Sequence, residues 1–369
     1  MRSKAAVILA ILNCFLLAAV ASGQDKPGSD DVVRVDTQLV DVPITVTDKT
    51  GKPIAGLKIG NFEVYEDGRK QELAEFAATN APFEVALLLD TSGSTRSDLQ
   101  LIQRAAQQFI ASLRPGDRVS LIAYTTKRDD VQAYAAAEIL SGLTDDRAKL
   151  KTAADKISTS NGTPYYDSLI DIAEKVFHDR PSDEFRGRRA LVALTDGVDS
   201  TSAADFAEAK ERLEAAGVSS YFIQVDTRTF FEDNLLGDCQ NAIRFSQAQI
   251  RRYYRSFKGA GNMERAASFC QLGDFERLAV SKKLYEIADA EMNDLAKTSG
   301  GRVFPVADLS EARTAFRSVA DEIGTRYSLG YYSSNEKRDG TYRKITVQLK
   351  GIPPGAKLRA REGYTAPAN

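Results

Sequence analysis

The sequence predicts an α/β protein with a doubly wound, mainly parallel sheet, flanked by a small β module built from both ends of the chain. In the middle of the chain, short apolar runs alternate with amphipathic helical segments, and this order produces a parallel sheet with helices on both faces. Nearly continuous apolar runs are typical of strands that are buried on both faces. The predicted strands are 85–89, 119–124, 190–194, 221–225 and 303–306.

Two segments around these strands carry clear helical stripes. Apolar residues recur at the spacing of one helix face between Leu99 and Leu113, and again in a last helix from about Asp308 to Gly324. The alternation of strands and helices is interrupted over residues 227–282. This segment is far longer than a usual connection between a strand and a helix. We therefore expect an insertion with helices of its own before a helix that starts near Lys283.

Alternating apolar residues predict strands at both ends of the chain. Val40, Val42, Ile44 and Val46 alternate with polar neighbours, and residues 345–349 repeat the pattern. Neither end has enough strands for a sheet that is stable alone. We therefore expect an N-terminal β segment (32–80) and a C-terminal β segment (327–369) to form one module, with an α/β domain (81–326) inserted between them.

The first residues predict export from the cell. Basic Arg2 and Lys4 precede an apolar run over 5–20 and small residues over 21–23, which indicates a signal peptide (1–23) followed by a linker (24–31). The run is short for a membrane span. We expect a secreted or periplasmic protein without a stable membrane span after cleavage. Cys239 and Cys270 would remain, either as a disulfide or as two buried thiols.

Composition argues against several classes of function. The chain has 49 Lys and Arg against 51 Asp and Glu, so bulk charge does not favour binding to nucleic acid. The basic run over 251–258 is accordingly expected to be a solvated helix face. A single histidine, His178, leaves little for a histidine-based zinc site or a Ser-His-Asp triad.

Oxygen-bearing side chains gather where the predicted strands end. Asp90, Ser92 and Ser94 follow the first strand of the α/β domain, and Asp196 follows the strand over 190–194. Ligands of doubly wound sheets bind at the carboxyl ends of the strands. Thr163, in a loop before another helix, offers one more hydroxyl. Hard cations such as Mg²⁺ take oxygen ligands of this kind, so the sequence predicts a divalent metal site.

These five residues resemble the metal-ion-dependent adhesion site (MIDAS) of the von Willebrand factor type A family, written Asp-x-Ser-x-Ser, then Thr, then Asp. The likeness covers about 83–326, apart from the insertion. It implies a cation, Mg²⁺ with Mn²⁺ or Ca²⁺ as alternatives, that binds an Asp or Glu carboxylate of a protein partner. It therefore implies a module for adhesion that is not an enzyme, and family domains can switch affinity by shifting the last helix.

The flanking segments carry a second, less specific likeness. Phe62–Gly68 and Arg361–Tyr364 are similar to segments of secreted bacterial proteins with a von Willebrand type A-related domain, of the acidobacterial kind.

Two other functions fit part of the pattern. Phosphoaspartyl hydrolases of the haloacid dehalogenase type also place an Asp beside Mg²⁺ at the end of the first strand. Their general acid and base would fall at Ser92, and a hydroxyl is a poor proton shuttle near neutral pH. The third reading is a scaffold whose metal site is decayed or purely structural.

Overall fold

The computed structural model describes residues 39–78, 81–257, 268–352 and 354–368. Residues 37–369 form one compact unit, which holds all the elements below. The expected signal peptide (1–23) and linker (24–31) lie outside the described residues. None of the helices in the described ranges combines the length and hydropathy that are needed to cross a membrane.

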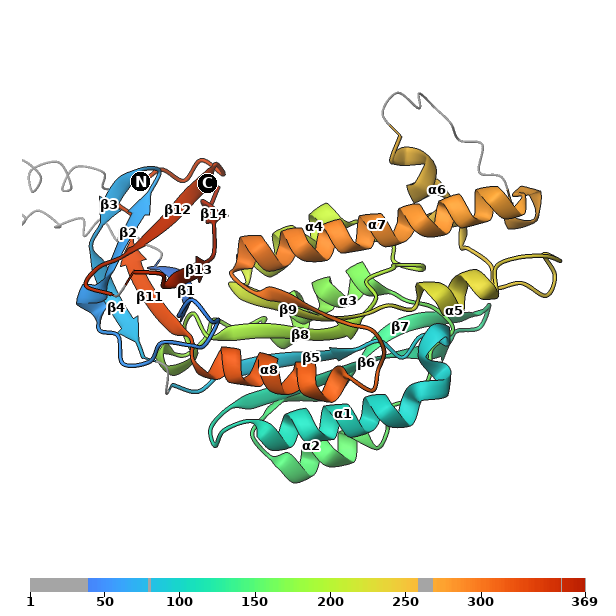
Figure 1. Ribbon diagram of the computed structural model, residues 1–369, viewed down its shortest axis with the longest axis horizontal. Helices are drawn as coiled ribbons and strands as arrows, with labels where there is room; N and C mark the ends of the chain where they lie inside the picture. Colours follow the sequence, from blue (N-terminus) through green and yellow to red (C-terminus); the bar gives the residue numbers. More distant parts are fainter. Residues whose placement is uncertain (1–38, 79–80, 258–267, 353, 369) are drawn as a thin grey trace, which may run out of the picture. The chain divides into compact units, whose positions relative to one another are not determined.

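A six-stranded sheet forms the centre of the fold and confirms the predicted fold class (Figure 1). Five of its strands are mutually parallel, and only β7 at one edge runs antiparallel to its neighbour β6. In spatial order the strands are β10 (Arg302–Val306), β9 (Val218–Val225), β8 (Arg189–Thr195), β5 (Glu84–Leu89), β6 (Arg118–Arg128) and β7 (Ala133–Thr144).

Helices cover both faces of this sheet, which explains why its strands read as continuous apolar runs. In β5, Val85, Leu87 and Leu89 enter one core cluster, while Ala86 and Leu88 enter the other. Side chains that alternate along a strand point to opposite faces. One face is covered by α1 (Leu99–Ser112), α2 (Arg147–Ala154) and α8 (Ala312–Gly324). The other is covered by α3 (Tyr165–Asp171), its π-helical continuation Ile172–Val176, α4 (Phe206–Ala215) and α7 (Asp274–Ser299).

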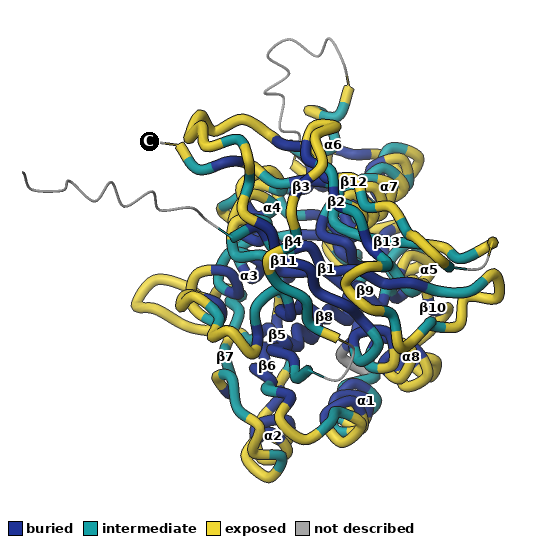
Figure 2. Tube along the Cα trace, turned by 90° about the vertical axis from the view of Figure 1, so that its left-hand side faces the viewer, coloured by how far each residue is buried: buried dark blue, intermediate teal, exposed yellow. Residues whose placement is uncertain are grey.

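Two features of this domain differ from the sequence prediction. The edge strand β7 was not predicted, because its alanine-rich first half is exposed or half-buried and lacks the large aliphatic side chains of the other strands (Figure 2). Helix α7 begins at Asp274, whereas the sequence predicted a helix start near Lys283. The early turns of α7 therefore lie within the range 227–282, and Val280 and the following Leu284 pack against the insertion.

Strands from both ends of the chain interleave in two further sheets, and a shared core joins them. The first sheet has the order β13 (Lys357–Ala360), β1 (Leu39–Thr47), β11 (Tyr327–Tyr332) and β4 (Leu73–Ala77). The second has the order β14 (Gly363–Thr365), β12 (Tyr342–Leu349), β2 (Phe62–Glu66) and β3 (Arg69–Gln71). A short 3-10 turn, Ile59–Asn61, precedes β2. We refer to these strands as the β module.

A buried ion pair lies at the centre of the β module. Glu66 is 2% exposed and accepts hydrogen bonds from the hydroxyls of Tyr331 (2.8 Å), Tyr364 (3.0 Å) and Ser333 (2.6 Å). The guanidinium of Arg343, itself buried, lies 3.3 Å from the Glu66 carboxylate. This network joins Phe62–Gly68 to Arg361–Tyr364, the two segments that carry the flanking likeness.

The β module meets the central sheet where β5 and β8 begin. Arg188 is 1% exposed there, and its guanidinium donates to the carbonyl oxygens of Pro82 (3.0 Å) and Ala81 (2.7 Å). In the next position, Arg189 pairs with Glu84 at 3.1 Å. The junction therefore occupies the amino ends of the parallel strands, and their carboxyl ends are left for other contacts.

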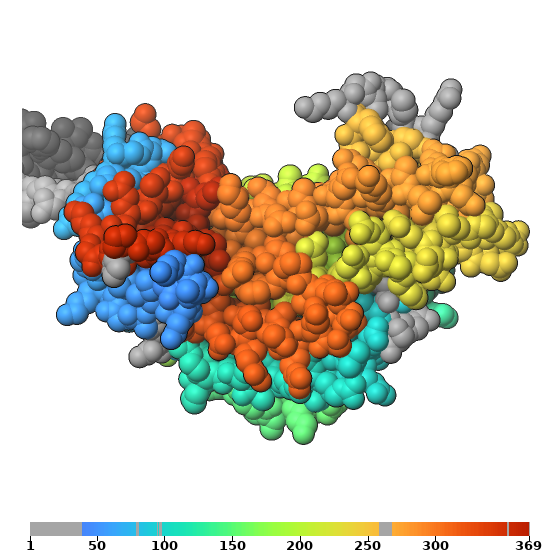
Figure 3. All heavy atoms as spheres, viewed as in Figure 1, coloured from blue at the N-terminus to red at the C-terminus, as the bar shows by residue number. Residues whose placement is uncertain are grey.

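The insertion folds around a small core of its own beside those carboxyl ends. Its helices are α5 (Arg228–Asp233) and α6 (Gln247–Arg255), with a 3-10 turn at Phe269–Gln271. Leu235, Phe245 and Ile250 pack against the first turns of α7, and Figure 3 shows this region in yellow and orange. A disulfide joins Cys239 to Cys270, whose Cα atoms are 5.3 Å apart.

The basic run of the insertion is only partly a solvated helix face. Arg251 and Arg255 are exposed, as expected. Arg252 instead turns inward and pairs with the buried carboxylate of Asp199 at 3.2 Å. Lys258, at the end of the run, lies outside the described residues.

Candidate metal centre

The two aspartates of the predicted site lie side by side at the carboxyl edge of the sheet. Asp90 follows β5 and Asp196 follows β8, and these strands are parallel neighbours in which Leu89 is paired with Leu194. The backbone N–H of Asp90 continues this ladder, because it donates to the carbonyl of Leu194 at 2.9 Å. The register of two buried strands therefore brings residues that are a hundred positions apart into one crevice.

Asp90 is buried and held by hydrogen bonds from both sides of the crevice. Its Oδ1 accepts from the backbone N–H of Ser92 at 3.0 Å, and its Oδ2 accepts from the hydroxyl of Thr195 at 2.8 Å. Burial raises the pKa of Asp90 despite these hydrogen bonds, because removal from water disfavours the ionised carboxylate. No cationic side chain contributes to this shift within the described part of the chain.

The turn after Asp90 is fixed by a residue that sequence reasoning did not single out. The hydroxyl of Thr95 donates to the carbonyls of Asp90 and Ser92, both at 3.1 Å. This contact shapes the 3-10 segment Gly93–Asp98, which leads into α1. Ser92 is buried in the turn. The backbone of Ser94 belongs to the same segment, but its side chain lies outside what the structure describes.

Thr163 is brought to the same edge by a pair of loops that are bonded to each other. Its backbone N–H donates to the hydroxyl of Ser200 at 2.8 Å, and its carbonyl accepts from the N–H of Ser200 at 3.0 Å. Thr163 is 7% exposed and lines the same cavity as Ser92 and Asp196. The loop before α3 is therefore tied to the loop that follows Asp196.

Asp196 is held by the insertion and by α7. Its Oδ1 accepts from the N–H of Val198 at 2.9 Å, and its Oδ2 accepts from the hydroxyl of Thr227, which also contacts the hydroxyl of Tyr285 at 2.8 Å. Burial, reinforced by the nearby charge of Asp90, raises the pKa of Asp196 to about 7. Gly197 follows with φ +74°, and a Cβ there would lie 2.9 Å from Met292 of α7.

These residues fit a hard divalent cation. Asp90 is buried and Asp196 is half-buried; removal from water raises both pKa values, the charge of Asp90 raises that of Asp196 further, and no cationic side chain offsets either carboxylate among the described residues. Such a pair is costly unless a positive charge is supplied. The described residues contain no cluster of three or more His, Cys, Asp or Glu side chains. A cation here would therefore need hydroxyl oxygens as well, which suits Mg²⁺ better than a soft metal.

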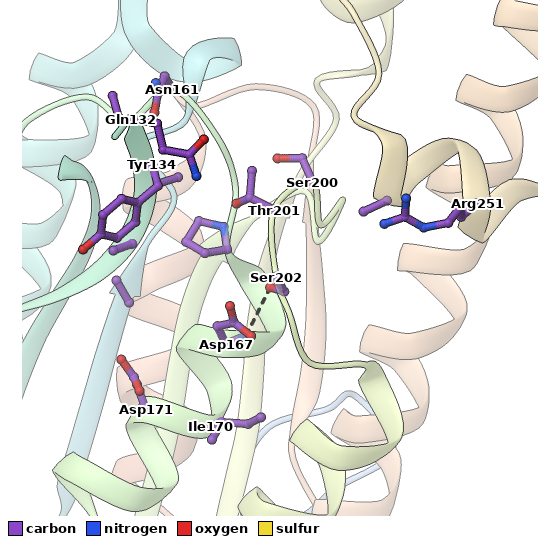
Figure 4. A pocket seen from close by; sticks show the side chains of 16 residues that line it. Gln132, Tyr134, Asn161, Asp167, Ile170, Asp171, Ser200, Thr201, Ser202 and Arg251 are labelled. Atoms are coloured by element: carbon purple, nitrogen blue, oxygen red, sulfur yellow. Dashed lines mark hydrogen bonds between the residues drawn. The ribbon is translucent and has the colours of Figure 1, made fainter. Parts of the chain in front are cut away.

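A cavity of about 420 Å³ opens directly over this centre. Ser92, Thr163 and Asp196 form part of its lining, and residues of the insertion and α7 form the rest. Through Asn161 and Ser200, the cavity adjoins a second one of about 750 Å³ that lies beside the edge strand β7. Figure 4 shows this second cavity, with Asp167 and Asp171 on α3, Tyr134 across from them, and Arg251 reaching in from α6.

Several residues that shape the centre have no signature in the sequence. Thr227 is distant in the chain from Asp196 and contacts it only because the insertion folds back over the sheet, and Tyr285 in turn contacts Thr227. Asp199, which accepts from the N–H of Tyr165 at 3.0 Å, fixes the start of α3. Thr195 is the exception. It directly precedes Asp196 at a strand end, and this position could have indicated a residue of the centre.

Comparisons with known proteins agree with this fold. Residues 85–198 match the family described as von Willebrand factor type A domain. That segment runs from β5 through the loop after Asp196, so it spans all five predicted metal ligands. The domain thus has the von Willebrand factor type A fold. No curated protein matches the chain.

Solved structures with similar folds come from distant proteins. Proximal thread matrix protein 1 from the mussel byssus is 14% identical, over 77% of this chain and 50% of the mussel chain, with a TM-score of 0.41. A von Willebrand factor type A protein from Catenulispora acidiphila is 13% identical, over 90% of this chain and 75% of its own, with a TM-score of 0.41. The conserved hypothetical protein BatB from Bacteroides thetaiotaomicron is 17% identical, over 65% of this chain and 98% of its own, with a TM-score of 0.36. This chain spans about half the length of the mussel protein.

Proposed function

We propose that this protein is an adhesion module that binds a carboxylate of a protein partner through a divalent cation, most readily Mg²⁺, with Mn²⁺ or Ca²⁺ as alternatives. Asp90, Ser92, Ser94, Thr163 and Asp196 would hold the cation. The observation that carries this proposal is the pair of neighbouring carboxylates at the strand ends, Asp90 buried and Asp196 half-buried at a cavity with hydroxyl groups, which lacks a cationic partner among the described residues.

The surrounding residues keep these oxygens in place. Thr195 and Thr227 each donate a hydrogen bond to one carboxylate, which fixes the orientation of Asp90 and Asp196 before any ligand binds. Preorganisation of this kind reduces the cost of ordering the site when it is loaded. A bound Mg²⁺ supplies positive charge and an open coordination position, which an Asp or Glu of the partner can fill.

A role in binding fits these residues better than catalysis. Von Willebrand factor type A domains are generally interaction modules without enzymatic activity. A phosphoaspartyl hydrolase would need a general acid and base at Ser92, where the chain offers only a hydroxyl. Secretion or transfer to the periplasm remains part of the proposal. The disulfide between Cys239 and Cys270 supports it, because disulfides persist in oxidising compartments.

Calorimetric titration of Mg²⁺ and Mn²⁺ into the protein tests the metal site. We expect the parent to bind both ions and the variants Asp90→Ala and Asp196→Ala to lose binding. Asp145→Ala, which removes an exposed carboxylate, is the matched control and should bind like the parent. A folded parent that binds neither ion would contradict the proposal. Steady Mg²⁺-dependent phosphatase turnover that vanishes in Asp90→Asn would favour the hydrolase instead.

A further inference from the structure

We propose that the insertion makes the site selective for carboxylates that carry an apolar group. The inference rests on the proposed function for the carboxylate itself, and it adds the chemistry of the neighbouring group. In a protein partner, this ligand is an Asp or Glu next to an aromatic or branched aliphatic residue in an extended segment. The lining of the 420 Å³ cavity and the contacts that hold that lining in place support this selectivity.

The cavity has two unlike walls. The wall from the central domain is polar and carries Ser92, Thr163 and Asp196. The other wall comes from the insertion and α7, and it combines large apolar side chains with the polar Arg244, Gln249, Ser281 and Tyr285. The large apolar side chains are Phe231, Ile243, Phe245 and Leu284. Phe245 and Leu284 are buried, whereas Phe231 and Ile243 are half-buried and keep some apolar surface open to solvent. Such surface is unfavourable until it is covered, so the wall favours a ligand that brings an apolar group with it.

The apolar wall is held firmly from behind. The ring centroids of Phe231 and Phe245 are 5.3 Å apart, and those of Phe245 and Phe269 are 5.8 Å apart. The disulfide between Cys239 and Cys270 closes the same small core. A wall that is packed and cross-linked in this way can discriminate between ligands, because it does not collapse into an empty cavity.

The apolar wall is also fixed relative to the loop that carries Asp196 and Asp199. Thr227, at the start of the insertion, donates directly to the carboxylate of Asp196. Arg252 of α6 pairs with Asp199 at 3.2 Å, and its guanidinium lies 4.6 Å from the ring centroid of Tyr166 on α3. The polar and apolar walls therefore have a defined separation, and one ligand can contact both.

The size and charge of the cavity indicate what fits. A volume of about 420 Å³ falls in the range of sites for small ligands and accommodates one or two side chains but no folded element. Arg244 is exposed at the rim and favours an acidic segment over a basic one. The occupant that satisfies both walls is therefore an acidic side chain with an apolar neighbour.

Acetate and 3-phenylpropionate are the probes, since both present a carboxylate and only the second carries an apolar ring. Their binding is measured by saturation-transfer NMR on the disulfide-bonded protein with saturating Mg²⁺, and again with EDTA. We expect 3-phenylpropionate to bind about tenfold more tightly than acetate, as burial of part of a phenyl ring predicts. The preference should fall to about twofold or less in Phe231→Ala and in Ile243→Ala.

Tyr134→Ala is the matched control, because it removes an aromatic ring from the adjoining cavity and should keep the full preference. Equal affinities of the parent for the two probes would overturn the inference, and so would a preference that survives both wall variants. The proposed function would survive this result if acetate still bound in Mg²⁺ and was released by EDTA. Binding of 3-phenylpropionate that ignores EDTA and Asp90→Ala, yet is lost in Phe231→Ala, would support the wall and remove the metal from the proposed function.

Discussion

Buried carboxylates are handled in opposite ways at the two ends of this protein. In the β module, the carboxylate of Glu66 receives three hydroxyl donors and an arginine, so its charge is satisfied within the fold. At the carboxyl edge of the central sheet, Asp90 is buried and Asp196 is half-buried, but both interact with hydroxyl and N–H groups, and the charge of Asp90 acts on Asp196.

The comparison shows how a structural charge differs from a functional one. A buried charge with a built-in partner holds the fold in one arrangement and needs nothing from outside. Buried charges of like sign without such a partner lower the stability of the fold until a ligand brings the missing charge. Perturbed groups of this kind gather at functional sites for that reason.

The largest expected effect comes from removing the built-in partner. Arg343→Met leaves Glu66 buried without its cation, and breaking a buried pair in this way costs about 3–5 kcal/mol. Urea unfolding should show this loss. Lys344→Met, which removes an exposed neighbouring charge, should change stability by less than about 0.5 kcal/mol. A loss below about 1 kcal/mol in Arg343→Met would mean that the hydroxyl groups alone satisfy Glu66.

A middle-sized effect is expected where the partner has to come from outside. A cation at a hundred times its dissociation constant should stabilise the parent by about 2.7 kcal/mol. Asp196→Asn removes one of two repelling charges. At pH 8 in EDTA, the variant should therefore melt at a higher temperature than the parent. In saturating Mn²⁺ at the same pH, the variant should melt at a lower temperature than the parent. Thermal unfolding with and without Mn²⁺ measures this crossing. Parallel behaviour of both proteins would show that Asp196 is no part of the metal centre.

The smallest effect sharpens the comparison inside the β module itself. Burial raises the pKa of Asp41 from 3.8 to about 7, against the lowering effect of Arg186 and Arg361. The folded state therefore binds this proton more tightly than the unfolded state, and stability falls as pH rises from about 4 to about 7. The full shift would correspond to about 4 kcal/mol, but Asp41 is only half-buried and solvent screens its charge, so Asp41→Asn should gain about 1–2 kcal/mol at pH 8 relative to pH 4. Urea unfolding at both pH values checks it, and a pH-independent difference between the proteins would argue against burial as the cause.

The parts of the fold that follow a strong local pattern could be predicted from the sequence. The runs at 85–89 and 190–194 are buried on both faces, so their apolar continuity gave the sheet, and the sheet placed Asp90 and Asp196 at one edge. The interleaved β module could also be predicted, because neither end of the chain has enough strands to form a sheet alone.

The parts that depend on packing between distant segments could not be predicted. Strand β7 is an edge strand whose first half is alanine-rich and exposed or half-buried, so it lacks the large aliphatic run of its neighbours. Arg252 looked like a solvated residue of a basic run, and only the fold of the insertion directs it to Asp199. The contact of Thr227 with Asp196 depends on the same fold, and for that reason the apolar wall of the cavity was not foreseen.

The junction with the β module and the metal centre lie at opposite ends of the same parallel strands. Glu84 and Arg189 form an ion pair where β5 and β8 begin, and Asp90 and Asp196 follow where these strands end. If a partner binds the proposed metal centre and pulls on it, the force would load β5 and β8 along their length, with their interstrand hydrogen bonds in shear. Many such bonds would have to break together, so the proposed adhesion site would resist tension along these strands.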